Sequence, residues 1–174
     1  KLGFKNKIEF NNHHHCHLAS TFYPSGFNRS LIVSYDGLGE YETGLIGIGQ
    51  KDKIKIIYNK NVFPDSLGLI YSAITYFLGW KAFYDEGIIM GLAPYGDPNL
   101  KVPNSKKSYI QIFREIIQYK NGLSYKINPE WITYNYEKNT WLSEKFSKTF
   151  GLKRNYNSKI NKHHKNIAAA LQTR

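Results

Sequence analysis

The stretch that decides the expected fold is Ser30-Leu31-Ile32-Val33-Ser34-Tyr35, followed at once by Asp36-Gly37-Leu38-Gly39. Its first part is apolar and β-branched, which favours a strand, and the acidic, glycine-rich part that follows is typical of a turn. Two more strands are expected over 43–49 and 54–59, with Gln50-Lys51-Asp52 between them. Lys and Ile alternate at the start of the third strand, as they do in a half-exposed strand. The three runs together predict an antiparallel meander.

One helix is expected before this meander along the chain and another after it. Residues 12–23 can form a helix that Asn11 or Asn12 caps and that Pro24-Ser25-Gly26 ends. After the meander, Asp65 or Ser66 can cap a helix that runs to Leu78 with a buried apolar stripe. The order of strands and helices predicts an α/β protein.

The second half of the chain is less regular. Residues 106–120 predict an amphipathic helix, and 166–172 predict the start of a helix that reaches Arg174 without a C-terminal cap or a partner. Residues 86–96 carry glycines and a proline yet are strongly apolar, which predicts a buried loop. Residues 127–162 show no clear period, so no element is predicted there.

Composition narrows the class of protein. With 174 residues, 41% of them hydrophobic and 16% aromatic, the chain can form one domain with a core. The apolar run 87–93 is too short to span a bilayer, which excludes a membrane protein. The single cysteine and the lack of a signal segment predict an intracellular, cytoplasmic protein.

The formal charge of +11 is unevenly distributed. Residues 1–100 hold nine basic and nine acidic side chains, whereas 101–174 hold fifteen and four. Twenty of the twenty-four basic residues are Lys, which reads phosphates and bases less specifically than Arg. Abundant Lys, Ile, Asn and Tyr share A- and T-rich codons, so compositional drift explains much of the excess. Nucleic acid is therefore a disfavoured partner.

Four histidines fall within five residues: His13, His14, His15 and His17. On a helix, His13 and His17 project from one face a turn apart, which is the spacing that two imidazoles need to share a metal ion. Asp36, at the end of the following strand, is the nearest third ligand. Two His and a carboxylate suit Fe(II) or a similar divalent metal, with zinc as the competing occupant. The alternative is an ordinary helix, because many carry the same spacing.

The glycines after Asp36 have two interpretations. Gly37 and Gly39 can bring backbone N–H groups close to a phosphate or a polar substrate. However, Asp-Gly is also a common hairpin pair that needs no ligand.

In order along the chain, these stretches resemble the O-carbamoyltransferases of nodulation factors, cephamycin and tobramycin. The matching runs are His13-His14 with His17, Ser20 to Ser25, Asp36 to Glu40, Phe63 to Tyr71, Met90 to Pro98 and Ile167 to Gln172. The resemblance implies a mixed sheet with flanking helices, similar to the ribonuclease-H-like fold of actin, sugar kinases and heat-shock ATPases. It also implies that residues 1–174 are part of an N-terminal domain truncated at both ends, with a C-terminal adenylate-forming domain lying outside the chain.

In such a family, carbamoyl phosphate and ATP form carbamoyl adenylate, and the carbamoyl group then passes to a hydroxyl of a small-molecule acceptor near a bound iron ion. The resemblance implies that His13, His17 and Asp36 are metal ligands and that a further acidic ligand lies outside the chain. His14 points off that face of the helix and is the candidate general base, with helix-surface or supporting duty as its alternative.

The same resemblance implies that nucleotide or substrate contacts involve Gly37, Gly39, Glu86, Met90 and Gly91. One departure is Ile88, which stands where the family usually has Lys.

The sequence also allows two rival functions. A related tRNA threonylcarbamoyl-transfer enzyme shares the fold and the HxxxH pair, and a basic module could bind nucleic acid without catalysis. The acceptor itself, whether a sugar, an antibiotic or a polysaccharide unit, leaves no visible signature in these motifs.

Overall fold

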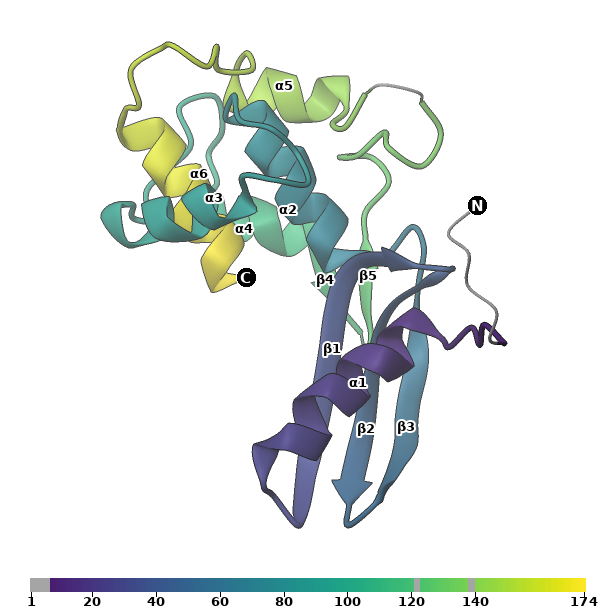
Figure 1. Ribbon diagram of the computed structural model, residues 1–174. Helices are drawn as coiled ribbons and strands as arrows, with labels where there is room; N and C mark the ends of the chain where they lie inside the picture. The colour runs from purple at the N-terminus through teal and green to yellow at the C-terminus, as the bar shows by residue number, and fades with distance from the viewer. Residues whose placement is uncertain (1–6, 121–122, 138–139) are drawn as a thin grey trace.

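The computed structural model describes residues 7–120, 123–137 and 140–174. Its first part is an antiparallel sheet in the order β1-β2-β3, formed by Arg29–Gly39, Glu42–Gln50 and Lys53–Val62. Helix α1, His13–Phe22, lies across one face of this sheet (Figure 1). A short 3-10 turn, Tyr23–Ser25, leads from the helix into β1. The predicted helix and meander are thus confirmed.

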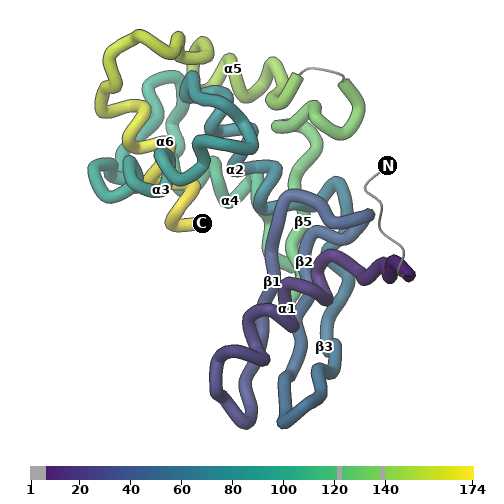
Figure 2. The backbone as a smooth tube through the Cα atoms, in the orientation of Figure 1, coloured from purple at the N-terminus to yellow at the C-terminus, as the bar shows by residue number. Residues whose placement is uncertain are grey.

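The second part is mainly helical. Helix α2, Leu67–Phe77, leaves the meander and enters a group formed by α3, Glu86–Leu92, α4, Tyr109–Ile116, α5, Glu144–Phe150, and α6, Lys162–Thr173 (Figure 2). A 3-10 turn, Ala93–Tyr95, follows α3. Strands β4, Ile117–Tyr119, and β5, Tyr125–Ile127, form a separate antiparallel pair.

Each part has its own apolar cluster. Under α1, Leu18 and Phe22 pack on Ile32 and Leu45 of the sheet. The helices enclose a much larger cluster, in which Ile74, Phe113 and Ile167 are almost fully buried. Burial of these apolar surfaces is the main force that holds each part together.

Close backbone packing joins the two parts. A Cβ at Gly68, in the first turn of α2, would lie 2.5 Å from the backbone N of Gly37 and 2.6 Å from the carbonyl carbon of Asp36. Ser66 caps α2 through the backbone N of Leu69, and its hydroxyl donates to the carbonyl oxygens of Asp36 and Gly37. The start of α2 therefore fixes the strand segment that carries Asp36.

Two predictions for the first hundred residues were wrong. Strand β1 does not end at Asp36 but continues to Gly39, with a shift of register between Tyr35 and Gly39, and the turn falls at Glu40 and Tyr41. Residues expected to form a loop over 86–96 form α3 and a 3-10 turn, and Ile88 and Met90 are exposed rather than buried. Ile89 alone in that run is fully buried, and its insertion among the helices supports α3 despite the glycines.

The other two differences concern helix ends. Helix α4 ends at Ile116 rather than Lys120, because residues 117–119 pair with β5. Helix α6 begins at Lys162 rather than at residue 166, because Asn161 caps it there: its side chain accepts from the backbone N of His164, whose ring accepts from the N of Asn161.

The α/β class is confirmed, whereas the ribonuclease-H-like fold stays a prediction. All strand pairs in the described part of the chain are antiparallel, so the mixed sheet is not seen there. Within the same ranges, no helix combines the length and apolarity that crossing a membrane requires.

Candidate metal centre

Helix α1 presents His13 and His17 on one face. Asn12 caps the helix by accepting from the backbone N of His15, which places His13 in the first turn. The Nε2 atoms of His13 and His17 lie 2.9 Å apart. The two imidazoles therefore converge on one point beside the sheet, as their spacing of four residues predicts.

Asp36 reaches the same point from β1. Its Oδ2 lies 2.7 Å from Nε2 of His13 and 3.2 Å from Nε2 of His17. Burial raises the pKa of Asp36, but hydrogen bonds from His13, Gly37 and His17 outweigh it, so the net pKa lies below the usual value. The carboxylate is ionised at neutral pH and able to act as a ligand.

The geometry of these three donors fits a divalent ion. One nitrogen from each His and one oxygen from Asp36 lie within 4.8 Å of one another. Metal bonds of about 2.0–2.2 Å place neighbouring ligand atoms about 3 Å apart, close to the 2.7, 2.9 and 3.2 Å seen here. The side chains are 41%, 48% and 43% exposed for His13, His17 and Asp36, so space remains for further ligands.

The absence of a side chain at Gly39 makes room for His13. A Cβ at Gly39 would lie 2.5 Å from Cδ2 of the His13 ring. That this glycine offers a backbone donor to a substrate stays a prediction, whereas its close approach to the His13 ring is seen directly. Gly37 differs, because its N–H donates to Oδ1 of Asp36 at 2.6 Å and thus orients the carboxylate.

His14 is fully buried between α1 and the sheet. Its Nδ1 lies 2.8 Å from the hydroxyl of Ser34, and its Nε2 lies 3.1 Å from the carbonyl oxygen of Glu42. These contacts favour a positioning role for His14 over the general-base role that we predicted, because both ring nitrogens have partners and the ring does not reach solvent.

Asn12 and Glu42 support the same helix, and the sequence analysis missed the contact between them. The side-chain amide of Asn12 donates to Oε2 of Glu42 at 2.7 Å, while its oxygen caps α1. Glu42 is almost fully buried. A possible N-cap at Asn12 was visible in the sequence, but its pairing with a residue 30 positions away was not.

Three of the predicted substrate residues, Gly37, Glu86 and Met90, line a hollow beside this centre. A hollow of about 490 Å³ adjoins Asp36 and Gly37, and Glu86 and Met90 of α3 line its other side. Gly91 is exposed, does not line the hollow, and has open space where a side chain would lie. Tyr71 and Gln172 also belong to this lining. Both lie in runs that carry the family resemblance, but the sequence analysis gave neither residue a role, since no local pattern places them beside Asp36.

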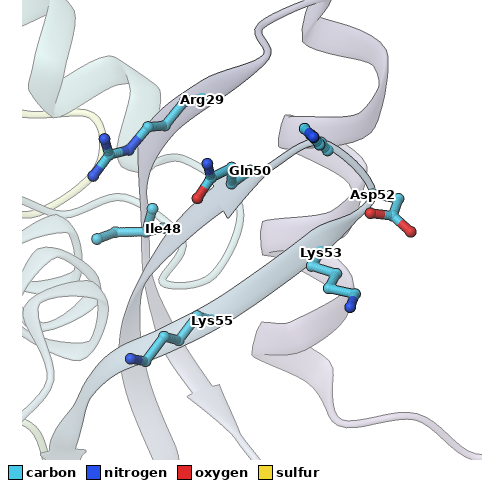
Figure 3. A pocket seen from close by; sticks show the side chains of 7 residues that line it. Arg29, Ile48, Gln50, Asp52, Lys53 and Lys55 are labelled. Carbon is cyan, nitrogen blue, oxygen red and sulfur yellow. The ribbon is translucent and has the colours of Figure 1, made fainter.

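A second hollow, of about 550 Å³, lies at the opposite end of the meander (Figure 3). Four basic side chains line it: Arg29, Lys51, Lys53 and Lys55. Asp52 is the one acid in that lining. The two ends of the sheet therefore differ in charge, with the His–Asp cluster at one and a group of cations at the other.

Comparison with known proteins identifies the family. A model described as Carbamoyltransferase N-terminus matches residues 1–174. The chain belongs to this family. The resemblance seen in the sequence motifs is thus confirmed, and membership of the carbamoyltransferase family connects the chain with carbamoyl transfer in general.

Three relatives of this carbamoyltransferase N-terminus show how far the likeness extends. An uncharacterised protein of Synechocystis sp. is 34% identical over 166 residues, which cover 94% of this chain and 25% of that protein. Nodulation protein NolNO of Sinorhizobium fredii is 45% identical over 94 residues, 53% of this chain and 13% of the relative. Nodulation protein NolO of Bradyrhizobium diazoefficiens is 35% identical over 119 residues, 67% of this chain and 20% of the relative. The matched regions span about a quarter or less of these relatives.

Proposed function

We propose that this chain forms the metal-binding part of an O-carbamoyltransferase that passes a carbamoyl group from carbamoyl adenylate to a hydroxyl of a small-molecule acceptor. The observation that carries the proposal is the convergence of His13, His17 and Asp36 on one point in a chain of the carbamoyltransferase family. Carbamoyl phosphate and ATP are the proposed sources of the adenylate, which a C-terminal adenylate-forming domain would supply.

The donor set suggests the kind of metal. Two imidazoles and one carboxylate, with open positions remaining, suit Fe(II), although zinc accepts the same donors. Such an ion would supply Lewis acidity to the oxygens on which charge develops during transfer. His13, His17 and Asp36 would hold it, and Gly37 would keep the carboxylate oriented through its N–H.

The transfer step needs few groups from this chain. The acceptor oxygen forms a bond to the carbamoyl carbon, while the bond from that carbon to the phosphate oxygen breaks and AMP leaves with the electron pair. The hydroxyl proton is released to solvent. The described part of the chain positions the proposed metal ligands. The start of α2 holds the segment of Asp36, and His14 holds α1 against the sheet. The proposed centre would therefore be in place before the substrate binds.

Specific observations weigh on the rival functions. The family match and the two nodulation relatives support an O-carbamoyltransferase rather than a tRNA threonylcarbamoyl-transfer enzyme. The basic group Arg29, Lys51, Lys53 and Lys55 lies at the far end of the sheet from the His–Asp cluster. This arrangement gives no support to a nucleic-acid module built around the His cluster.

Metal binding by the intact protein tests the proposal. After anaerobic loading with Fe(II), or with Co(II) as a spectroscopic probe, we expect His13→Ala and His17→Ala to weaken binding by more than about 100-fold, since even supporting groups change affinity about 10–100-fold. His15→Ala is the matched control, because His15 is exposed on the same helix and caps nothing through its side chain. Equal metal content in all four proteins would refute the metal centre.

Activity completes the test. The intact protein, supplied with carbamoyl phosphate, ATP and a hydroxyl acceptor, should release AMP and form a carbamate ester only when its metal site is intact. Product formation that persists in His13→Ala would separate carbamoyl transfer from the proposed centre.

A further inference from the structure

The end of the meander farthest from the helical part carries cations and exposed apolar side chains together (Figure 1). Four cations line the hollow of about 550 Å³ at this end: Arg29, Lys51, Lys53 and Lys55. Phe27 and Leu31 flank Arg29 in the sequence, and their side chains are 66% and 63% exposed. We call these six residues the basic tip.

The geometry of the sheet places part of the basic tip on the face opposite α1. Ile32 packs under α1, so Leu31 faces the other way, and Arg29 shares the face of Leu31. Lys55 lies between two isoleucines that pack on the cluster under α1, so Lys55 also faces away from that helix. Pairing through Ile48 joins Leu31 to Lys55 in one row across the sheet. Cations and apolar side chains therefore share one open face.

The cations of the basic tip have no acidic partner among the described residues. No ion pair within residues 7–120, 123–137 and 140–174 involves any of the four. Asp52 is the one acid that lines the hollow, and its side chain points to the other side of the hairpin from Arg29 and Lys55 (Figure 3). Like charges gathered in this way repel one another, and an anionic partner would relieve the repulsion.

Phe27 is held at the surface by an ordered loop. Its backbone N donates to Oγ of Ser25 at 3.2 Å. The next residue, Asn28, accepts through its carbonyl oxygen from the backbone N of Lys51 at 2.9 Å. The loop after α1 and the turn between β2 and β3 therefore form one surface, in which an exposed aromatic ring lies next to a turn that carries a cation.

This combination suits an extended anionic surface better than a small anion. A small-molecule pocket encloses most of its ligand, whereas the cations of the basic tip lie on an open sheet face and along a turn. Phe27 and Leu31 would contribute nothing to binding a free phosphate. At a bilayer surface both kinds of side chain contribute, because cations attract anionic headgroups and exposed apolar side chains enter the interface.

We propose that the basic tip docks this protein on an anionic lipid surface. Its cations pair with headgroup phosphates, and Phe27 enters the interface. Such docking needs no helix that spans the bilayer. Arg29 and Asp36 lie seven residues apart on β1, which at about 3.3 Å per residue is roughly 23 Å. The basic tip and the proposed metal centre are therefore separate sites, and the inference does not rest on the proposed function.

Co-sedimentation of the intact protein with vesicles tests the proposal. Vesicles of equal parts phosphatidylcholine and phosphatidylglycerol should bind the protein, and vesicles of phosphatidylcholine alone should bind much less of it. Raising the NaCl concentration from about 0.1 M to about 1 M shortens the Debye length from about 10 Å to about 3 Å and should release most of the bound protein. Equal binding to both kinds of vesicle, or binding to neither, would overturn the proposal.

Two variants locate the contact. Arg29→Gln combined with Lys55→Gln should weaken binding to the anionic vesicles about 25-fold, at about fivefold for each cation. Phe27→Ala should weaken it about tenfold, because less apolar surface enters the interface. All three side chains are exposed, so both variants should fold, which circular dichroism checks. Unweakened vesicle binding by both folded variants would refute docking through the basic tip.

Matched controls lie on the helical part. Lys106→Gln combined with Lys159→Gln removes the same charge from two exposed positions, and Leu152→Ala shortens a side chain that is 91% exposed. Both controls should bind the anionic vesicles as the unaltered protein does. A loss in the lysine control equal to that in the tip variant would mean that net charge binds the lipid, and the proposal would fail.

A single-stranded RNA oligonucleotide, offered without vesicles, separates lipid from nucleic acid as the partner. We expect weak RNA binding that Arg29→Gln combined with Lys55→Gln leaves unchanged. RNA binding that this double variant abolishes, with vesicle binding retained, would assign the basic tip to nucleic acid and overturn the proposal.

Discussion

The apolar cluster under α1 and the cluster among the helices differ in size and in what they support. The first contains four buried residues among those described, and the second contains twenty-two. Yet all three proposed metal ligands belong to the part with the smaller cluster, on α1 and β1. The helical part contributes backbone packing: the start of α2 lies directly against the backbone of Asp36. The comparison teaches that metal-site geometry depends on few apolar contacts, supplemented by buried polar ones.

The largest expected effect comes from core truncations in the two clusters. Phe113→Ala, in the helical cluster, should lower the free energy of unfolding by about 3–5 kcal/mol. Leu18→Ala, under α1, should cost about 2–3 kcal/mol, since the partly buried Ile54 and Ile56 can settle into the gap. Denaturant titration measures both values.

Metal affinity distinguishes Leu18→Ala from Phe113→Ala more clearly than stability does. Only Leu18→Ala should weaken metal binding under folding conditions, because only Leu18 supports the helix that carries both histidines. An equal loss of metal in folded Phe113→Ala would mean that the two clusters do not act separately.

Losing a buried polar contact should lower the free energy of unfolding less than the two core truncations do. Ser34→Ala leaves Nδ1 of the buried His14 without its partner and should cost about 1–2 kcal/mol. It should also weaken metal binding, because His14 anchors α1 to the sheet. Ser30→Ala, on the same strand and half-buried, is the control and should change neither quantity. Unchanged stability in Ser34→Ala would show that this contact does not hold the helix.

The smallest effect concerns acid sensitivity in the helical part. Burial lowers the pKa of His164 from 6.5, and the charges of His163 and Arg154 lower it further. The folded state therefore binds a proton less readily than the unfolded state, so the free energy of unfolding falls as the pH drops below 6.5 towards the folded pKa.

His164→Gln isolates this contribution. The amide keeps an acceptor for the backbone N of Asn161, so the cap of α6 is retained while the titrating group is removed. The stability of the variant should fall less between about pH 7 and pH 5, as measured by thermal unfolding across that range. Parallel curves for the two proteins would assign the acid sensitivity elsewhere.

Local patterns predicted the first half of the fold well. Asn12 and Ser66 cap α1 and α2 as predicted, and an apolar, β-branched run placed the first strand and alternation the third. Such caps and patterns are properties of neighbouring residues. The same reasoning misread residues 86–96, where burial of Ile89 and the contacts of Glu86 support a helix that glycines disfavour. It also extended α4 too far, since pairing with β5 competes for residues 117–119.

The candidate site divides in the same way. Spacing alone put His13 and His17 on one helical face, because helix geometry acts over a short range. The end of the next strand made Asp36 the plausible third ligand. Gln172 accepts from Tyr71 across 101 positions, and Phe83 owes its exposure to contacts with Glu86 and Trp141. Only folding of the chain brings such residues together, since no periodic pattern links side chains so far apart in the sequence. The sequence determined that two histidines share a helical face, because helix geometry is local. The tertiary structure decided that Asp36 meets them and that a hollow lined by acids and aromatic rings lies beside them, because only chain folding brings distant residues together.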